Sequence, residues 1–207
     1  MSEILFEACV DNVSDAVSAI KSGAHRLELC SRLDLDGLTP NNELIQYCMA
    51  QEFPFKAMVR PREGDFSYTI EEKSRMAETI EEFIKIGIHD IVMGAIQNDK
   101  LDIDFIRQLA SRFPSIKITI HKAIDHSKKL FEDIEHLKSI KQVVAILSSG
   151  GSGTAMQNRD VLKLMHQKCI PDIQLVIAGK VTQNNIPSLF AATGCTQFHG
   201  KRIMEDS

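Results

Sequence analysis

The sequence predicts an α/β protein that folds as a single (β/α)8 barrel of the TIM type, with its eighth helix missing or reduced. Eight short apolar segments alternate with segments whose apolar residues recur at helical spacing. Strands separated by helices form a parallel sheet, because parallel neighbours need a helical crossover. The number of strands favours a closed barrel over an open doubly wound sheet, and so does the lack of a Gly-x-Gly-x-x-Gly turn after the first strand.

The expected strands are short apolar runs that recur along the whole chain. Only eight residues follow the last of them, which is too few for a full eighth helix. The eight segments are Ile4–Cys9, Arg26–Cys30, Phe55–Arg60, Asp90–Gly94, Lys117–His121, Val143–Ser148, Ile173–Ala178 and Cys195–His199.

The expected helices lie between these strands and begin at residues that can cap them. Thr69 and Glu72 are spaced as a capping box, in which each side chain accepts a hydrogen bond from the backbone of the other. Thr39 with Pro40, and Thr182, are predicted to begin two further helices. The apolar repeats cover Val13–Ile20, Ile70–Ile84, Ile103–Ala110, Leu130–Leu137 and Ile186–Phe190, and Gly23, Gly87 and Gly194 are expected to end helices.

The composition is ordinary for a soluble globular protein, and residues 1–207 are expected to form one domain because no linker divides them. The net charge is −4, and the 24 basic residues form no block, which argues against a nucleic-acid partner. The longest apolar runs, such as Val143–Leu147, are too short to span a membrane, and no export signal is expected. Five cysteines without a Cys-x-x-Cys spacing argue against a disulfide framework and favour the reducing cytoplasm.

Charged residues occur at the carboxyl ends of the first three strands, where a barrel of this type carries its functional groups. Residues i and i+2 of a strand share a face, so Glu7 should lie beside Cys9, and Glu28 beside Cys30. If both pairs point inward, the carboxylates form one layer and the thiols the layer above. Arg60 is the expected counter-charge, because a buried carboxylate needs a partner. These charged residues form either a structural ion network or part of a functional site.

Cys9 and Cys30 are the candidate metal ligands. Thiolates are soft ligands that select Cu(I) or Zn(II), and two of them on adjacent strands suit Cu(I), which accepts a low coordination number. Their sulfurs should then lie within about 4–5 Å of each other, because two metal–sulfur bonds of about 2.3 Å meet at one ion. Alternatively, both thiols only pack in the core. The other cysteines are interpreted as structural, with Cys48 in a helix, Cys169 in the connection before the seventh strand and Cys195 at the start of the eighth.

Further polar groups are expected on the same rim of the barrel. His121 and His199 end two strands there, and Thr119 shares a strand face with His121. The backbone N–H groups of Gly150 and Gly151 either cradle an anion or serve only the turn.

The segment from Arg60 to Tyr68 combines arginines, acids and aromatic residues in one long loop. Arg60 and Arg62 could fold it over the rim and hold an anionic ligand. Alternatively, Asp65 pairs with one of the arginines and fastens the loop to itself.

At these residues the sequence resembles the CutC family, a family of barrel proteins linked to copper homeostasis. The resemblance extends through nearly the whole chain, with departures from the family pattern at Glu63, Lys122 and Lys180. The motifs that carry it, in chain order, are Glu7-Ala-Cys-Val-Asp11, Gly23-Ala-His-Arg-Leu-Glu-Leu-Cys30, Gly37-Leu-Thr-Pro40, Arg60-Pro-Arg-Glu-Gly-Asp-Phe-Ser-Tyr68, His121-Lys-Ala-Ile-Asp125, Ser148-Ser-Gly-Gly151 and Phe198-His-Gly200.

The resemblance implies a cytoplasmic copper(I)-binding protein of copper homeostasis, with Cys9 and Cys30 as the ligands. The alternative is a TIM-barrel enzyme that acts on a small anionic metabolite at the mouth of the barrel, phosphorylated compounds included. In that case Glu7, Glu28 and His121 are the acid–base candidates. A scaffold without chemistry is the third hypothesis, which the polar strand ends argue against. The ligand-binding candidates of the enzyme hypothesis are Arg60, Arg62, Asp65, Thr119, His199, Gly150 and Gly151.

The missing eighth helix also predicts a partner. Without it, apolar surface over the first and last strands would face water. We therefore expect a homo-oligomer, a dimer, that buries this surface.

Overall fold

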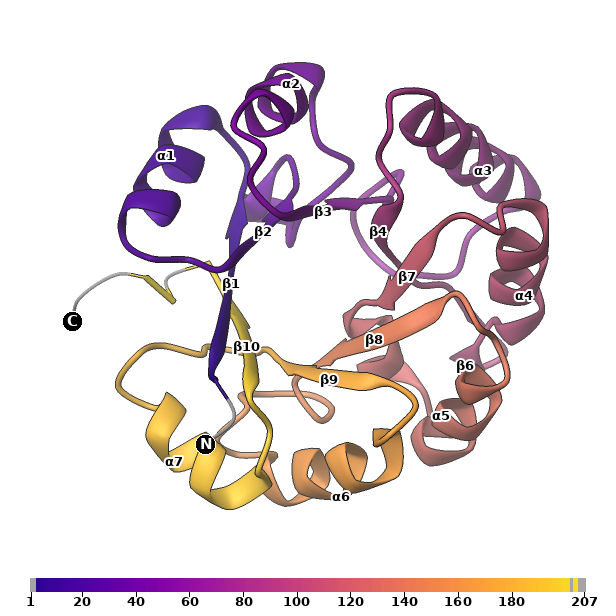
Figure 1. The fold of residues 1–207 in the computed structure, drawn as a ribbon. Coiled ribbons are helices and arrows are strands. Elements are labelled where there is room, and N and C mark those ends of the chain that lie inside the picture. Colours follow the sequence, from indigo (N-terminus) through magenta and orange to yellow (C-terminus); the bar gives the residue numbers. More distant parts are fainter. Residues whose placement is uncertain (1–2, 202, 205–207) are drawn as a thin grey trace.

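The computed structural model describes residues 3–201 and 203–204. Eight parallel strands close into a barrel in the order β1-β10-β9-β8-β7-β4-β3-β2, and the helices form a ring outside it (Figure 1). This confirms the predicted (β/α)8 barrel. The strands of the barrel are β1 (Leu5–Val10), β2 (Arg26–Leu29), β3 (Phe55–Met58), β4 (Asp90–Met93), β7 (Lys117–Ile120), β8 (Val143–Ser148), β9 (Gln174–Ile177) and β10 (Gln197–Gly200).

Seven α-helices connect the strands within the described residues, as predicted. After β10 the described residues 201, 203 and 204 form turns, so no eighth helix covers this side there. Figure 1 shows α1 and α7 flanking β1 and β10. The helices are α1 (Val13–Lys21), α2 (Asn42–Ala50), α3 (Ile70–Lys85), α4 (Ile103–Arg112), α5 (Leu130–Lys138), α6 (Arg159–Cys169) and α7 (Ile186–Thr193).

The loops also contain short elements that the apolar pattern did not predict. They are the 3-10 helices η1 (Leu33–Leu35) and η2 (Lys122–His126) and an antiparallel pair after β4, formed by β5 (Ile96–Gln97) and β6 (Lys100–Leu101). Cys169, which we expected in a connection, is instead the last residue of α6.

Of the three predicted helix caps, the structure confirms one and contradicts two. Thr69 and Glu72 form the predicted capping box. Thr39 does not cap α2; Asn41 does, and the hydroxyl of Thr39 instead exchanges hydrogen bonds with the backbone of Arg60. Thr182 likewise does not cap α7, which begins after Asn185.

The core of the described residues consists of three clusters. The largest lies between the barrel and its helices. Two smaller clusters are separate from it. They lie inside the barrel, because residues along each strand point alternately inward and outward. One contains Cys9, Cys30, Met58 and Val92, and the other contains Ala145, Leu147, Val176 and Ala178. The barrel interior is therefore polar and sulfur-rich on one side and lined by aliphatic residues on the other.

None of the helices in the described part of the chain is both long and apolar enough to cross a membrane.

Candidate functional site

The register of the first two strands sets the arrangement of the site. β1 and β2 pair so that Glu7 lies opposite Arg26, and Cys9 opposite Glu28. The expected carboxylate layer below a thiol layer is therefore wrong. Neighbouring strands of a closed barrel are staggered along one another, and this stagger places a carboxylate beside a thiol.

Cys9 and Cys30 nevertheless lie side by side. Their Sγ atoms are 3.6 Å apart, and both side chains are buried against Met58 and Val92. The separation falls within the limit that two metal–sulfur bonds to one ion impose. The spacing expected from the sequence for a two-sulfur site is thus confirmed.

Glu28 and His199 complete a cluster of donor atoms around the thiols. Cys9 Sγ donates to Glu28 Oε2 at 3.2 Å, and Cys30 Sγ lies 3.6 Å from the same oxygen. His199 Nε2 is also 3.6 Å from it. One donor atom each of Cys9, Glu28 and His199 lies within 4.8 Å of the others, so this group could hold a metal ion. The sulfur-containing donor set suits a soft or borderline cation.

Glu7 lies below this cluster, fully buried and surrounded by cations. It contacts the guanidinium of Arg26, lies 3.2 Å from Lys56 Nζ, and is 3.0 Å from His199 Nδ1. Burial alone would raise the pKa of Glu7, but Lys56, His199 and Arg26 together hold that pKa well below its usual range. Glu7 is therefore ionised, and it forms an ion network with these three side chains.

His199 links the two glutamates and is charged. Burial by itself would lower the pKa of its imidazole. The charge of Glu28, with hydrogen bonds to Cys9 and Glu7, outweighs burial and raises this pKa well above its usual value.

Both thiols are protonated when no metal is bound. The hydrogen bond with Cys30, together with burial, raises the pKa of Cys9 well above its usual value. The same bond lowers the pKa of Cys30, but burial and the charge of Glu28 prevail and raise it to about 11. A metal ion would therefore have to displace both protons.

Arg60 is buried but does not neutralise the glutamates. Its Nη1 donates to the carbonyl oxygens of Leu35 and Gly37, each at 3.1 Å, and its Nη2 donates to that of Gly64 at 3.0 Å. The expectation that Arg60 is the counter-charge is wrong, because the cations described above already surround Glu7. The side chain of Arg60 instead joins two loops at the mouth.

The loop that follows Arg60 is fastened to itself. Arg62 pairs with Asp65 at 3.0 Å and with Glu72 at 2.6 Å, and Asp65 also accepts a hydrogen bond from the backbone of Ser67. Of the two interpretations of Asp65, the structure shows the one in which it staples the loop through Arg62.

His121 and Thr119 lie inside the barrel with polar atoms unpaired. The Nδ1 atom of His121 accepts a hydrogen bond from the backbone N–H of Ala123 at 3.1 Å. Its Nε2 atom and the hydroxyl of Thr119 have no hydrogen-bond partner among the described residues. Burial, with the charge of Arg60, lowers the pKa of His121 to about 3, so its imidazole is neutral.

The loop of Gly150 and Gly151 does cradle an anion, but the anion belongs to the protein. The carboxylate of Asp125 accepts hydrogen bonds from the backbone N–H groups of Ser149 and Gly151, at 2.9 and 3.1 Å. It also accepts from the hydroxyls of Ser148 and Ser149. Asp125 therefore occupies this loop in the structure, and binding of a ligand's anion by Gly150 and Gly151 stays a prediction.

Four residues near the candidate sites were not singled out from the sequence. Lys56 and Met58 share the inward face of β3 with Arg60, and Arg26 shares that of β2 with Glu28. Alternation along these strands was the signal that could have identified them. Asp125 lies in the first turn of η2 and gave no comparable signal, because its partners come from a loop more than twenty residues away.

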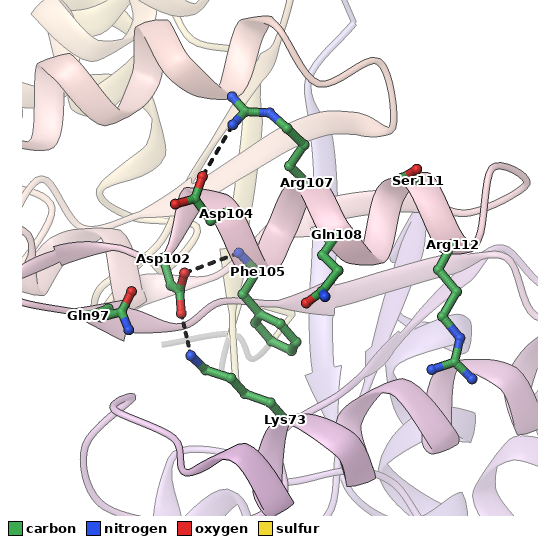
Figure 2. A pocket seen from close by; sticks show the side chains of 9 residues that line it. All are labelled: Lys73, Gln97, Asp102, Asp104, Phe105, Arg107, Gln108, Ser111 and Arg112. Carbon is green, nitrogen blue, oxygen red and sulfur yellow. Dashed lines mark hydrogen bonds and ion pairs between the residues drawn. The ribbon is translucent and has the colours of Figure 1, made fainter.

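One cavity lies outside the barrel. It has a volume of 670 Å³ and opens between α3 and α4. Figure 2 shows that Lys73 points to Asp102, and Arg107 to Asp104, so these charges on its wall are already paired. A smaller cavity of 280 Å³ reaches Cys9 from the side between α1 and the turns after β10. Cys9 is the one residue of the thiol cluster that lines this second cavity.

A closed parallel barrel with polar groups gathered at the carboxyl ends of its strands defines the class of TIM-barrel proteins. Residues 4–204 match the sequence model of the CutC family. The chain belongs to the CutC family.

The relatives agree with this assignment over most of their length. A CutC family protein from Caulobacter vibrioides (strain NA1000 / CB15N) is 32% identical over 198 residues, which cover 95% of this chain and 80% of the relative. One from Vibrio parahaemolyticus is 34% identical over 200 residues, covering 93% of this chain and 79% of the relative.

Solved structures support the same fold. The crystal structure of a candidate copper homeostasis protein CutC from Streptococcus agalactiae superposes with a TM-score of 0.89 at 28% identity, covering 97% of this chain and 99% of that one. The homocysteine methyltransferase MmuM from Escherichia coli superposes with a TM-score of 0.64 at 13% identity, covering 97% and 90%. The latter likeness shows the fold alone.

Proposed function

We propose that this protein binds Cu(I) through Cys9 and Cys30 and serves copper homeostasis in the cytoplasm. The observation that carries the proposal is the 3.6 Å separation of two buried sulfur atoms from different strands. Thiolates are the ligands that Cu(I) prefers, and two of them can satisfy its low coordination number.

The geometry requires little rearrangement. Two metal–sulfur bonds of about 2.3 Å at one ion allow a sulfur separation of up to about 4.6 Å, so the thiols need to part by only about 1 Å for a linear arrangement. Met58, which packs against both cysteines, offers the soft thioether that would tolerate such an ion nearby.

The charges around the thiols suit the deprotonation that binding demands. Binding releases the thiol protons, because only thiolates are ligands. Glu28 Oε2 accepts the hydrogen of Cys9 and lies equally near Cys30 Sγ and His199 Nε2, so it is the first acceptor for a departing proton. The charged imidazole of His199 balances the negative charge of the resulting copper–thiolate unit.

The family supports the role. The related protein from Streptococcus agalactiae is described as a candidate for copper homeostasis, and we extend that role to this chain. All five cysteines are free and buried, as suits a reducing compartment.

The homo-oligomer remains a prediction of this proposal. The side of the barrel between α1 and α7, which no helix covers in the described part of the chain, is where a second copy would bind. Light scattering at micromolar concentration checks it, and a monomer would contradict it.

The acid–base roles considered for Glu7, Glu28 and His121 in an enzyme also remain predictions. The three cations around Glu7 favour a structural role for that residue.

The test is an anaerobic competition for Cu(I) against a colorimetric chelator. Wild type should bind one Cu(I) tightly, and Cys9→Ser should lose binding about as fully as the Cys9→Ser/Cys30→Ser double variant, because one thiolate leaves the ion under-coordinated. Cys48→Ser is the matched control, since Cys48 is equally buried but lies in α2. Equal affinity in wild type and the double variant would overturn the proposal.

A further inference from the structure

We propose that Arg60, Thr119 and His121 form a second site, which binds a small ligand through a carboxylate or phosphate oxygen. The site lies on the β3–β7 side of the barrel mouth and does not use the thiols. It goes beyond the proposed copper function and does not depend on it.

The strand register brings these residues together. Met58 pairs with Val92, and Met93 with Ile120, which places Arg60, Gly94 and His121 at one level across β3, β4 and β7. Thr119 shares the inward face of β7 with His121, one step deeper.

A single aromatic ring contacts both Arg60 and His121. The ring centroid of Phe66 lies 4.9 Å from the guanidinium carbon of Arg60 and 4.8 Å from the ring centroid of His121. The middle strand contributes no side chain between them, because it carries Gly94. A Cβ atom at Gly94 would lie 2.8 Å from His121 Nδ1, so this glycine leaves the space that the imidazole occupies.

The hydrogen bond from Ala123 fixes the tautomer of His121. Because Nδ1 accepts this bond, the proton of the neutral imidazole is on Nε2. The N–H group at Nε2 is thus a donor in a fixed direction, and it has no partner in the described part of the chain. A neutral histidine held in this way can polarise a carbonyl or bind an oxyanion without giving up its proton.

The neighbouring polar atoms are also unpaired. The hydroxyl of Thr119 and the Nε of Arg60 have no partner among residues 3–201 and 203–204. Thr119 is 1% exposed, and Arg60 and His121 are 4% exposed, so bulk water does not satisfy these groups. A buried donor without a partner is destabilising, and several of them in one place call for an acceptor that binds there.

The charge of the site indicates an anion. Arg60 makes no ion pair with the acids of the described residues; its partners are backbone carbonyls. A buried guanidinium that only carbonyl dipoles compensate favours a ligand with negative charge. The unpaired N–H groups of Arg60 and His121, with the hydroxyl of Thr119, favour a ligand that offers oxygen acceptors and disfavour a cation. The Asp125 loop is a weaker candidate, because its own carboxylate occupies it.

Phe66 is the group that must move for a ligand to enter. Its ring covers Arg60 and His121 but remains partly exposed at the surface of the loop. Rotation of this side chain would uncover Arg60 and His121.

The experiment follows the His121 ring nitrogens by NMR in protein labelled with 15N-histidine and kept free of metal. Inorganic phosphate and pyruvate are added separately, each to tens of millimolar. We expect the Nε2–H signal of His121 to shift with at least one of them: phosphate alone marks a phosphoryl ligand, and pyruvate alone a carboxylate. A saturable shift of this signal in both titrations supports an oxyanion site that does not distinguish phosphate from carboxylate.

Variants separate this site from others. Thr119→Val removes one hydroxyl and should weaken binding by about threefold to tenfold, the usual effect of one hydrogen bond. His121→Asn keeps an acceptor for the Ala123 N–H and removes the Nε2 donor, and should weaken binding at least as much by calorimetry. Thr193→Val is the matched control, because the buried hydroxyl of Thr193 already bonds to Leu189 in α7, away from the mouth.

The same titrations in the Cys9→Ser/Cys30→Ser variant should match wild type, so that a failure of the copper proposal leaves this one standing. Two results would overturn the proposal. One is the absence of any shift with either anion, and the other is binding that Thr119→Val and His121→Asn leave unchanged.

Discussion

The carboxylate of Glu7 lies 3.0 Å from Nδ1 of His199, at the point where the first and last strands of the barrel pair. This contact joins the two ends of the chain's sheet and places the charged imidazole between Glu7 and the thiol cluster. The ion network below the thiols therefore also closes the barrel.

Glu7→Gln should destabilise the protein strongly. The substitution leaves Lys56, Arg26 and His199 close together without their shared carboxylate, and removing one partner of a buried ion network costs about 3–5 kcal/mol. Chemical denaturation measures the free energy of unfolding, with the exposed Glu82→Gln as the control. A loss below about 1 kcal/mol, typical of surface pairs, would show that the network is not structural.

His121 should make the protein less stable as the pH falls. Its pKa is about 3 in the folded protein and about 6.5 in the unfolded chain. The unfolded state therefore takes up a proton first, and the stability that the neutral imidazole contributes above pH 6.5 is lost as the pH falls toward 3. For this one group, the free energy of unfolding falls by at most about 1.4 kcal/mol per pH unit.

Two measurements check this pH dependence. Denaturation of wild type between pH 6 and pH 4 should show the slope, and His121→Asn should reduce it by the histidine's share. An NMR titration gives the pKa directly. A His121 signal that titrates near pH 6.5 would contradict the burial described for this ring.

Asp125→Ala should expose a vacant anion cradle. Without the carboxylate, the N–H groups of Ser149 and Gly151 lose their acceptor, and we expect a loss of about 2 kcal/mol in stability. Inorganic phosphate should then raise the Tm of the variant more than that of wild type, because only the variant offers the empty loop. The exposed Asp104→Ala serves as the control. Equal phosphate effects in variant and wild type would contradict the assignment of Asp125 as the resident anion.

Local patterns were sufficient to predict the barrel. Eight apolar runs, separated by helical repeats, correspond to eight barrel strands within about two residues at each end, and Thr69 with Glu72 forms the expected cap. Alternation along single strands also brought Glu7, Cys9, Glu28 and Cys30 to the interior. These features depend only on residues close together in the sequence.

The rest depended on relations between distant segments. The stagger that sets Cys9 beside Glu28 is a property of the closed barrel, which no single strand encodes. The partners of Arg60 are backbone carbonyls in two loops, and carbonyls carry no sequence signal. The same holds for Asp125, whose backbone partners exist only once the loop after β8 has its conformation.

X-ray absorption at the copper edge tests the central claim most directly. Protein loaded anaerobically with one equivalent of Cu(I) should show a first shell of sulfur atoms at about 2.2–2.3 Å, and this shell should disappear in the Cys9→Ser/Cys30→Ser variant while persisting in Cys48→Ser. A first shell of only nitrogen or oxygen in wild type, or a sulfur shell unchanged in the double variant, would show that Cys9 and Cys30 are not the copper ligands.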